Sequence, residues 1–206
     1  MHTTQKKILS AALAATLLTM ALPAGAFDYQ TKYYFPDCLV LADDKGISVN
    51  DEGEYFIDAK DLKPGDRICT TFTFMNLSQD DKWFELYIQT EPVSKQGPVN
   101  LFEEVELTIN MTEGAWPFKG CYFRGNLNGE GYSDFSRARG GKVNMAYEYG
   151  LQLGWYPAQT HGVFQIELRL DPKMKVYNEK SEAIFKWRFI ANEYVPPEPP
   201  EPFPKK

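Results

Sequence analysis

The residue types that most often act as nucleophiles or metal ligands, cysteine and histidine, are few and widely spaced in this chain. The chain has three cysteines, Cys38, Cys69 and Cys121, and its only histidines are His2 and His161. The cysteine spacings match no zinc finger or zinc ribbon, because those sites need close pairs of ligands. An odd number of cysteines allows at most one intramolecular disulfide, so both one unknown pair among the three and three unpaired cysteines fit the pattern.

The remaining candidates for catalysis favour ordinary surface roles. His161 lies in Pro157-Ala-Gln-Thr-His-Gly162, which is typical of a solvated turn before a strand, and no His-Glu-x-x-His motif is present. Glu103, Glu104 and Glu106 could supply the two carboxylates of a glycosidase, but their spacing is typical of a solvated strand face. The acidic residues that could bind calcium miss the EF-hand spacing; they are Asp43, Asp44, Asp51 and Glu52. The sequence predicts no catalytic residue, no metal and no cofactor, and hence a protein that is not an enzyme.

The first 26 residues have the pattern of an export signal. Lys6 and Lys7 precede an apolar run from Ile8 to Leu22, and Ala24-Gly25-Ala26 ends in the small-x-small pattern that signal peptidases cut. We therefore predict cleavage between Ala26 and Phe27. The segment carries two lysines and no acidic residue, so its loss takes the net charge from −6 to −8.

Charge and length narrow the functional classes further. An acidic mature chain of 206 − 26 = 180 residues disfavours binding to nucleic acid or to anionic lipid, and its length suits one domain with a real core. After residue 26, no apolar run approaches the ~18 residues of a membrane span. We expect a secreted protein that is extracellular or associated with the cell surface, with no membrane contact after cleavage.

Five segments alternate strictly between apolar and polar residues, which is the signature of half-buried β-strands. They are 66–76, 82–91, 104–111, 163–170 and 184–191. Weaker candidates are 38–42, 54–58, 119–123 and 145–153. The motifs Asp44-Lys45-Gly46 and Asp51-Glu52-Gly53 flank a short segment, which suggests a hairpin. Lys63, Pro64, Gly65 and Asp66 form a type II turn candidate. Short strands with one apolar face each predict an all-β fold, a two-sheet β-sandwich of the jelly-roll or Ig-like kind.

Two segments do not fit the strand pattern. Residues 125–141 contain five glycines, and we expect a long flexible loop there. Six prolines in the 11 residues 196–206 favour an extended tail that acts as a spacer or as a ligand for a partner. The predicted organisation is a signal peptide (1–26), an N-terminal segment (27–36), a sandwich domain (37–194) and a proline-rich tail (195–206).

The order of several short motifs resembles a known family. Asp61-Leu-Lys-Pro-Gly-Asp66 opens a Thr/Phe strand that ends at Met75-Asn-Leu-Ser78. Leu168-Arg-Leu-Asp-Pro172 and Val176-Tyr-Asn-Glu179 precede a closing strand, Ile184-Phe-Lys-Trp-Arg-Phe-Ile190. This arrangement resembles the TasA/camelysin family of secreted bacterial biofilm-matrix proteins, and equally a broad set of related bacterial cell-surface β-sandwich proteins. The resemblance is scattered over residues 1–194.

The resemblance implies a jelly-roll domain exported to the cell surface. In the TasA branch, subunits assemble into fibres in which an N-terminal segment completes the sheet of a neighbour. The matching candidate here is 27–35, with Tyr29, Tyr33, Tyr34 and Phe35 as its assembly residues; the alternatives are an edge strand of its own domain or a disordered end. Some relatives carry a wall anchor after a proline-rich spacer, and this sequence stops after the spacer. The metallopeptidase label of the camelysin branch finds no zinc-site residues here.

The leading prediction is a non-enzymatic structural subunit of the cell surface or biofilm matrix that self-associates or binds other matrix proteins. The alternative is an extracellular module that binds carbohydrate or another ligand, such as cell-wall polysaccharide. For that alternative, Trp83 and Tyr87 lie on the polar face of their strand, and further aromatic residues gather nearby in sequence: Tyr147, Tyr149, Trp155 and Tyr156. Exposed rings of this kind stack on sugars, although they also commonly cover a sheet.

Overall fold

The computed structural model describes residues 9–20, 31–34, 38–50, 58–79, 81–114, 119–135, 141–146, 150–175 and 180–195. These residues form two β-sheets and one short helix, α1 (Leu101–Glu104). The all-β, two-sheet architecture predicted from the sequence is confirmed.

One sheet has five strands in the order β12-β7-β14-β1-β5. Their bounds are Leu151–Tyr156, Trp83–Gln96, Glu182–Tyr194, Leu9–Met20 and Asp58–Leu62. The other has nine strands, eight of them in the order β11-β10-β9-β8-β13-β6-β3-β4, while β2 pairs with β6. Their bounds in that order are Lys142–Asn144, Glu130–Tyr132, Gly120–Asn126, Val105–Gly114, His161–Leu170, Arg67–Asn76, Cys38–Asp43 and Gly46–Asn50, with β2 at Thr31–Tyr34.

The five alternating segments are the long strands β6, β7, β8, β13 and β14, as predicted. Every apolar residue that the alternation assigns to the inner face of β13 is fully buried, from Phe164 to Leu170, while Gln165, Glu167 and Arg169 are partly exposed. Consecutive strands change sheet repeatedly, since β6, β8 and β13 belong to the nine-stranded sheet and β7, β12 and β14 to the five-stranded one.

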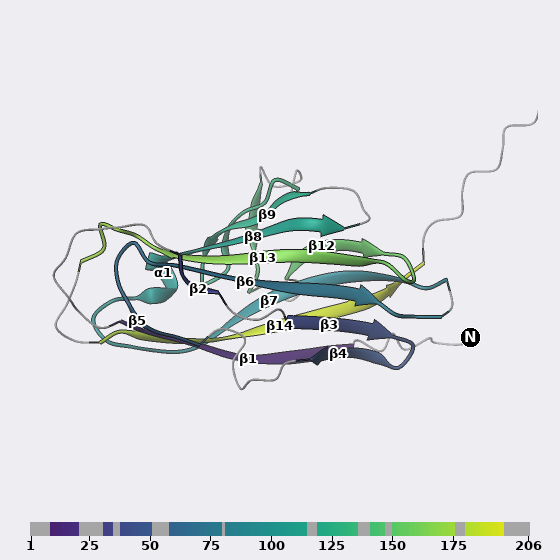
Figure 1. Cartoon of the computed structure of the whole chain (residues 1–206), viewed down its shortest axis with the longest axis horizontal. Helices are drawn as coiled ribbons and strands as arrows, with labels where there is room; N and C mark the ends of the chain where they lie inside the picture. Colours follow the sequence, from purple (N-terminus) through teal and green to yellow (C-terminus); the bar gives the residue numbers. More distant parts are fainter. Residues whose placement is uncertain are drawn as a thin grey trace, which may run out of the picture.

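The two sheets share one core. Phe72 of β6 lies with its ring centroid 5.0 Å from that of Phe189 of β14, and it stacks on Phe164 of its own sheet at 4.7 Å. Phe74 meets Tyr156 of β12 edge-on, also at 4.7 Å. The long strands of both sheets run along the long axis of the molecule (Figure 1). Aromatic contacts between the sheets therefore form the centre of the sandwich.

Two local predictions differ from the structure, which also contains one element that no sequence pattern indicated. Residues 125–141 do not form one long loop, because a tight turn at 127–129 joins β9 to β10, and β11 begins at Lys142. Gly125 and Gly131 face each other there, and a Cβ on Gly125 would lie 2.2 Å from the Glu130 carbonyl oxygen. The glycines thus permit close strand approach. The weak strand at 145–153 begins only at Leu151, and helix α1 was not predicted.

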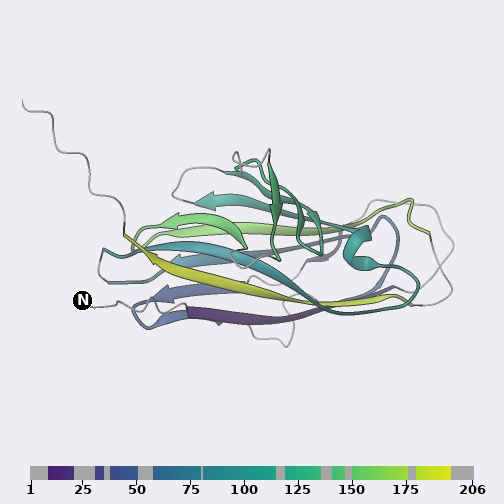
Figure 2. The ribbon, with the colours of Figure 1, turned by 180° about the vertical axis from the view of Figure 1, so that it is seen from behind.

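The N-terminal apolar segment forms strand β1 in the structure of the whole chain. It lies antiparallel to β14 and parallel to β5, and both views show β1 beside β14 (Figures 1 and 2). Cleavage at Ala26-Phe27 stays a prediction, and both residues lie outside the described ranges. Among the described residues, no helix has the length and apolarity that a membrane crossing requires.

Candidate functional site

The first candidate site is the backbone edge of β14 on which β1 lies. On one side β14 pairs with β7 along its whole length, from Glu182↔Gln96 to Tyr194↔Trp83. On the other side it pairs with β1 at nine positions between Leu9↔Ala191 and Thr19↔Glu182. Beyond β1 lies β5, which within the described strands pairs with β1 alone. Strand β1 is therefore the single strand that separates β14 from β5 in this sheet.

The inner face of β14 is part of the core. The side chains that it buries are Ala183, Phe185, Trp187, Phe189 and Ala191, each at most 4% exposed. Lys186 and Arg188 lie on the opposite face, where the Arg188 guanidinium contacts the Glu91 carboxylate at 3.3 Å. A chain without β1 would keep these buried residues beside an edge whose outward N–H and C=O groups have lost their partners. We expect this edge to bind an added strand more readily than an edge with solvated side chains would, because core side chains lie directly beside it.

The segment predicted to exchange lies partly within the described residues. Thr31–Tyr34 form β2, which runs parallel to the start of β6 with Tyr33 opposite Ile68 and Tyr34 opposite Cys69. Tyr29 and Phe35 lie outside the described residues. In the isolated chain, this segment therefore extends the chain's own nine-stranded sheet.

The turn predicted at Lys63-Asp66 has type II geometry. The Asp66 amide donates to the Lys63 carbonyl at 2.9 Å, and Gly65 has φ = 87°, which glycine adopts without a Cβ clash. The Asp66 carboxylate accepts a further bond from the Lys63 amide at 2.7 Å. Gly65 also donates to the Leu170 carbonyl at 3.0 Å, and Leu170 donates back to the Asp66 carbonyl. The turn thus attaches the start of β6 to the end of β13 and has a structural role.

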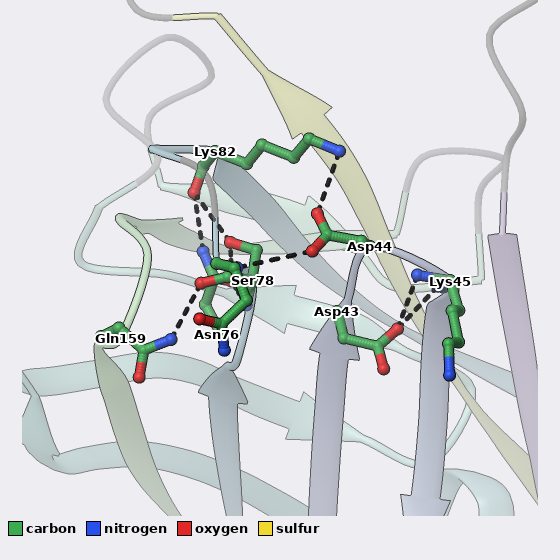
Figure 3. Close-up of polar contacts among 9 residues, drawn as sticks. Asp43, Asp44, Lys45, Asn76, Ser78, Lys82 and Gln159 are labelled. Carbon is green, nitrogen blue, oxygen red and sulfur yellow. Dashed lines mark hydrogen bonds and ion pairs between the residues drawn. The ribbon is translucent and has the colours of Figure 1, made fainter.

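Asn76 ends β6 with a fully buried and fully bonded amide (Figure 3). Its Nδ2 donates to the carbonyls of Lys82 and Tyr156, each at 2.9 Å, and its Oδ1 accepts from the Ser78 amide and hydroxyl at 3.0 and 2.7 Å. Gln159, which has φ = 60°, donates from Nε2 to the Ser78 carbonyl at 2.8 Å. This network fastens three loops at one end of the sandwich.

The acidic residues considered for calcium have other partners. Asp43 accepts bonds from the amides of Lys45 and Gly46 in the turn between β3 and β4. The Lys82 ammonium lies 3.0 Å from the Asp44 carboxylate, and this bond, together with one from the Gln79 amide, lowers the pKa of Asp44 below its ordinary value. Asp51 and Glu52 lie outside the described ranges. No group of three or more metal-ligating side chains occurs among the described residues.

The three cysteines are thiols, and no disulfide joins them in the structure. Cys38 and Cys69 are buried in neighbouring strands of one sheet, but the register pairs Cys38 with Phe72 rather than with Cys69. Cys121 is partly exposed, and its Sγ donates to the Phe123 carbonyl at 3.3 Å. Burial raises the pKa of the Cys69 and Cys121 thiols. Neither thiol therefore has the lowered pKa of a reactive cysteine.

A second candidate site is an open groove of about 710 Å³ on the outer face of the nine-stranded sheet. Glu103, Glu104 and Glu106, singled out in the sequence, line it. The structure adds side chains from other elements that sequence reasoning missed: Arg124, Asn126, Glu130, Tyr132, Arg169, Asp171 and Lys173. They come from separate strands and loops, so only the strand order brings them together. His161 lies elsewhere, exposed, with Nε2 3.6 Å from the Glu113 carboxylate.

The aromatic residues proposed for sugar binding separate into two groups. Trp83 and Trp155 lie half-buried on the outer face of the five-stranded sheet, with ring centroids 6.3 and 6.0 Å from that of Tyr194. Each tryptophan ring is tilted by about 50° to the Tyr194 ring, so neither forms a flat surface with it. Tyr156 is buried in the core, and burial raises its pKa. Burial and the neighbouring Glu85 also raise the pKa of Tyr87. Tyr147 and Tyr149 lie outside the described residues.

Comparison with known proteins found no match for the chain. No family model matches it, and neither a curated protein nor a solved structure matches it. The resemblance to the TasA/camelysin family therefore rests on the motifs alone, and the function must be argued from the two candidate sites.

Proposed function

We propose that the exported chain is a non-enzymatic structural subunit of a bacterial cell surface or biofilm matrix that assembles by β-strand exchange. The observation that supports this proposal is the position of β1 between β14 and β5. If signal peptidase removes residues 1–26, it removes β1, and the exported chain keeps β14 with one open edge. A strand from a second copy then takes the vacated place.

The N-terminal segment of the exported chain suits that place in length and pattern. Residues 27–35 alternate between Phe27, Tyr29, Thr31, Tyr33 and Phe35 on one face and Asp28, Gln30, Lys32 and Tyr34 on the other. An amphipathic strand of this kind can cover a core on one side while its other side faces water. Its nine residues equal the nine positions at which β1 pairs with β14. The donor would leave β6 of its own chain and join β14 of the next.

The energetic argument follows from the number of bonds. Each backbone hydrogen bond contributes about 0.5–1.5 kcal/mol net, and burial of aromatic rings against the core adds to this. A nine-residue donor offers several such bonds, whereas β2 pairs with β6 at only three positions. Strand exchange therefore forms more backbone hydrogen bonds on β14 than it breaks between β2 and β6. Because each copy has one donor and one acceptor, the association is head-to-tail and continues into a fibre.

As part of this proposal, we assign the sandwich to the jelly-roll type. Strands β6, β7 and β8 change sheet at each step, and so do β12, β13 and β14. This connectivity favours a jelly roll over an Ig-like sandwich, in which more neighbouring strands stay within one sheet.

The test compares residues 27–206 with residues 37–206 by light scattering and negative-stain microscopy over a range of concentrations. We expect fibres or large oligomers from the longer chain and monomers from the shorter one. A synthetic peptide of residues 27–36 should bind the shorter chain 1:1 and protect the β14 amides from hydrogen exchange. A scrambled peptide of the same composition is the control. Monomers at all concentrations in both chains would contradict strand exchange.

A further inference from the structure

The groove on the nine-stranded sheet combines an exposed ring with ordered rows of polar side chains. Tyr132 is 59% exposed, and it is the only exposed aromatic residue among the side chains that the structure describes. Tyrosine combines an apolar ring with a polar hydroxyl, and residues of this kind are enriched where a protein binds another molecule. The neighbouring Gly141 places no side chain beside the ring, at a position where a Cβ would lie 3.8 Å from Tyr132 Cδ1.

Strand register arranges the polar groups beside this ring. Arg169 of β13 pairs with Glu106 of β8, and Glu106 pairs with Asn126 of β9. Two residues before Asn126 on β9, Arg124 lies directly opposite Tyr132 of β10. Cross-strand neighbours have Cβ atoms about 4.5–5.5 Å apart, so a carboxylate, an amide and two guanidinium groups form a continuous surface around the ring.

We propose that this groove binds a neutral polysaccharide strand, with Tyr132 as the stacking platform. Sugar rings present an apolar C–H face to an aromatic ring and hydroxyl groups at their edges. A carboxylate accepts hydrogen bonds from such hydroxyls, a guanidinium group donates hydrogen bonds to them, and a side-chain amide does both. The groove is open, and the residues that line it include members of four neighbouring strands, β13, β8, β9 and β10, so a chain molecule can lie across these strands.

The charge of the groove selects the class of glycan. Five carboxylates line it, those of Glu103, Glu104, Glu106, Glu130 and Asp171, against three cationic groups, those of Arg124, Arg169 and Lys173. The lining therefore has a net charge of 3 − 5 = −2 at neutral pH. This sign repels polyanions such as nucleic acid or sulfated glycans and leaves a neutral glycan as the favoured ligand. The site is independent of strand exchange, because it lies on the other sheet from β14.

The test is isothermal titration calorimetry of the whole chain with hexasaccharides of four neutral types: β-1,4-glucan, β-1,3-glucan, xylan and N-acetylated chitin. Dextran sulfate serves as the polyanion. We expect at least one neutral glycan to bind, Tyr132→Ala to weaken it tenfold or more, and Tyr132→Phe to stay within about threefold because the ring remains. Trp83→Ala, on the opposite sheet, should bind like the wild type. Equal urea midpoints of Tyr132→Ala and wild type would show that its fold is intact.

Three results would overturn the proposal: no neutral glycan binds, dextran sulfate binds instead, or Tyr132→Ala binds as well as the wild type. Loss of binding in Trp83→Ala alone would move the site to the other sheet and would also overturn it. Strand exchange is tested separately, by light scattering of the chain of residues 27–206, which lacks β1. If that chain remains monomeric but binds glycan, only the proposed function is contradicted.

Discussion

Asn76 shows how one buried polar side chain can organise several loops. All four of its hydrogen bonds are satisfied inside the protein, and they join the end of β6 to the segments around Ser78, Lys82 and Tyr156. Removing the amide leaves buried partners without bonds, and each such group costs about 1–3 kcal/mol. The asparagine is therefore a structural residue, although it lies among exposed loops.

We expect Asn76→Ala to lower the free energy of unfolding by about 2–4 kcal/mol in urea denaturation. The matched control is Asn110→Ala, because Asn110 lies half-buried on β8 and its side chain has no hydrogen bond within the described part of the chain. That variant should lose less than about 1 kcal/mol. Equal losses in the two variants would show that the loop network does not stabilise the fold.

Asp44 gives the stability a defined pH dependence. The Lys82 side chain and the Gln79 amide favour its charged form, so its pKa in the folded protein lies below the ordinary value of 3.8. The stabilisation is complete above the unfolded-state pKa and is lost as the pH falls through the lower folded-state pKa. We expect wild type to be more stable than Asp44→Asn at neutral pH, and the difference to shrink below about pH 4.

Urea unfolding of wild type and Asp44→Asn between pH 2 and pH 7 measures this difference. Asp81→Asn is the control, because Asp81 is exposed, lies next to Lys82, and has no ion pair within the described residues. Its stability should follow that of the wild type at each pH. A difference between wild type and Asp44→Asn that does not change with pH would refute the assignment.

At the scale of elements, the alternation of each strand determines which face is buried, and the contact between strands of different sheets closes the core. Phe189 of β14 is fully buried and contacts Phe72 of β6, whose ring stacks on Phe164 of β13. Truncating such a side chain removes apolar contacts from both sheets and leaves a cavity.

Phe189→Ala should therefore lower the free energy of unfolding by about 3–5 kcal/mol, whereas Phe189→Leu should lose less than about 1.5 kcal/mol. Circular dichroism during urea unfolding measures both variants. A loss under about 1 kcal/mol in Phe189→Ala would mean that the two sheets do not depend on this contact.

At the scale of the whole molecule, the proposed assembly depends on whether β1 is present. In the whole chain β1 covers the edge of β14, so no donor strand can enter. On the strand-exchange proposal, we expect the chain that begins at Met1 to stay monomeric at concentrations at which the chain that begins at Phe27 associates.

Analytical ultracentrifugation of the two chains side by side measures this difference. The chain of residues 37–206, which has neither β1 nor the donor, controls for association through unrelated surfaces and should remain a monomer. Association of the Met1 chain into the same fibres would show that β14 is not the acceptor.

Sequence alone determined the class of fold and the faces of its main strands, because alternation depends only on the period of a strand. It identified the turn at Pro64-Gly65, since that conformation follows from two adjacent residues. It could not identify the β9–β10 hairpin, because Gly125 and Gly131 resemble loop glycines until the strands are paired.

The two candidate sites were decided by tertiary structure. The groove unites Glu106, Arg124, Tyr132 and Arg169 from four strands, and the pairing of β1 with β14 unites residues near both ends of the chain. Local patterns carry no information on which strands become neighbours, because strand order is settled by how the two apolar faces pack together.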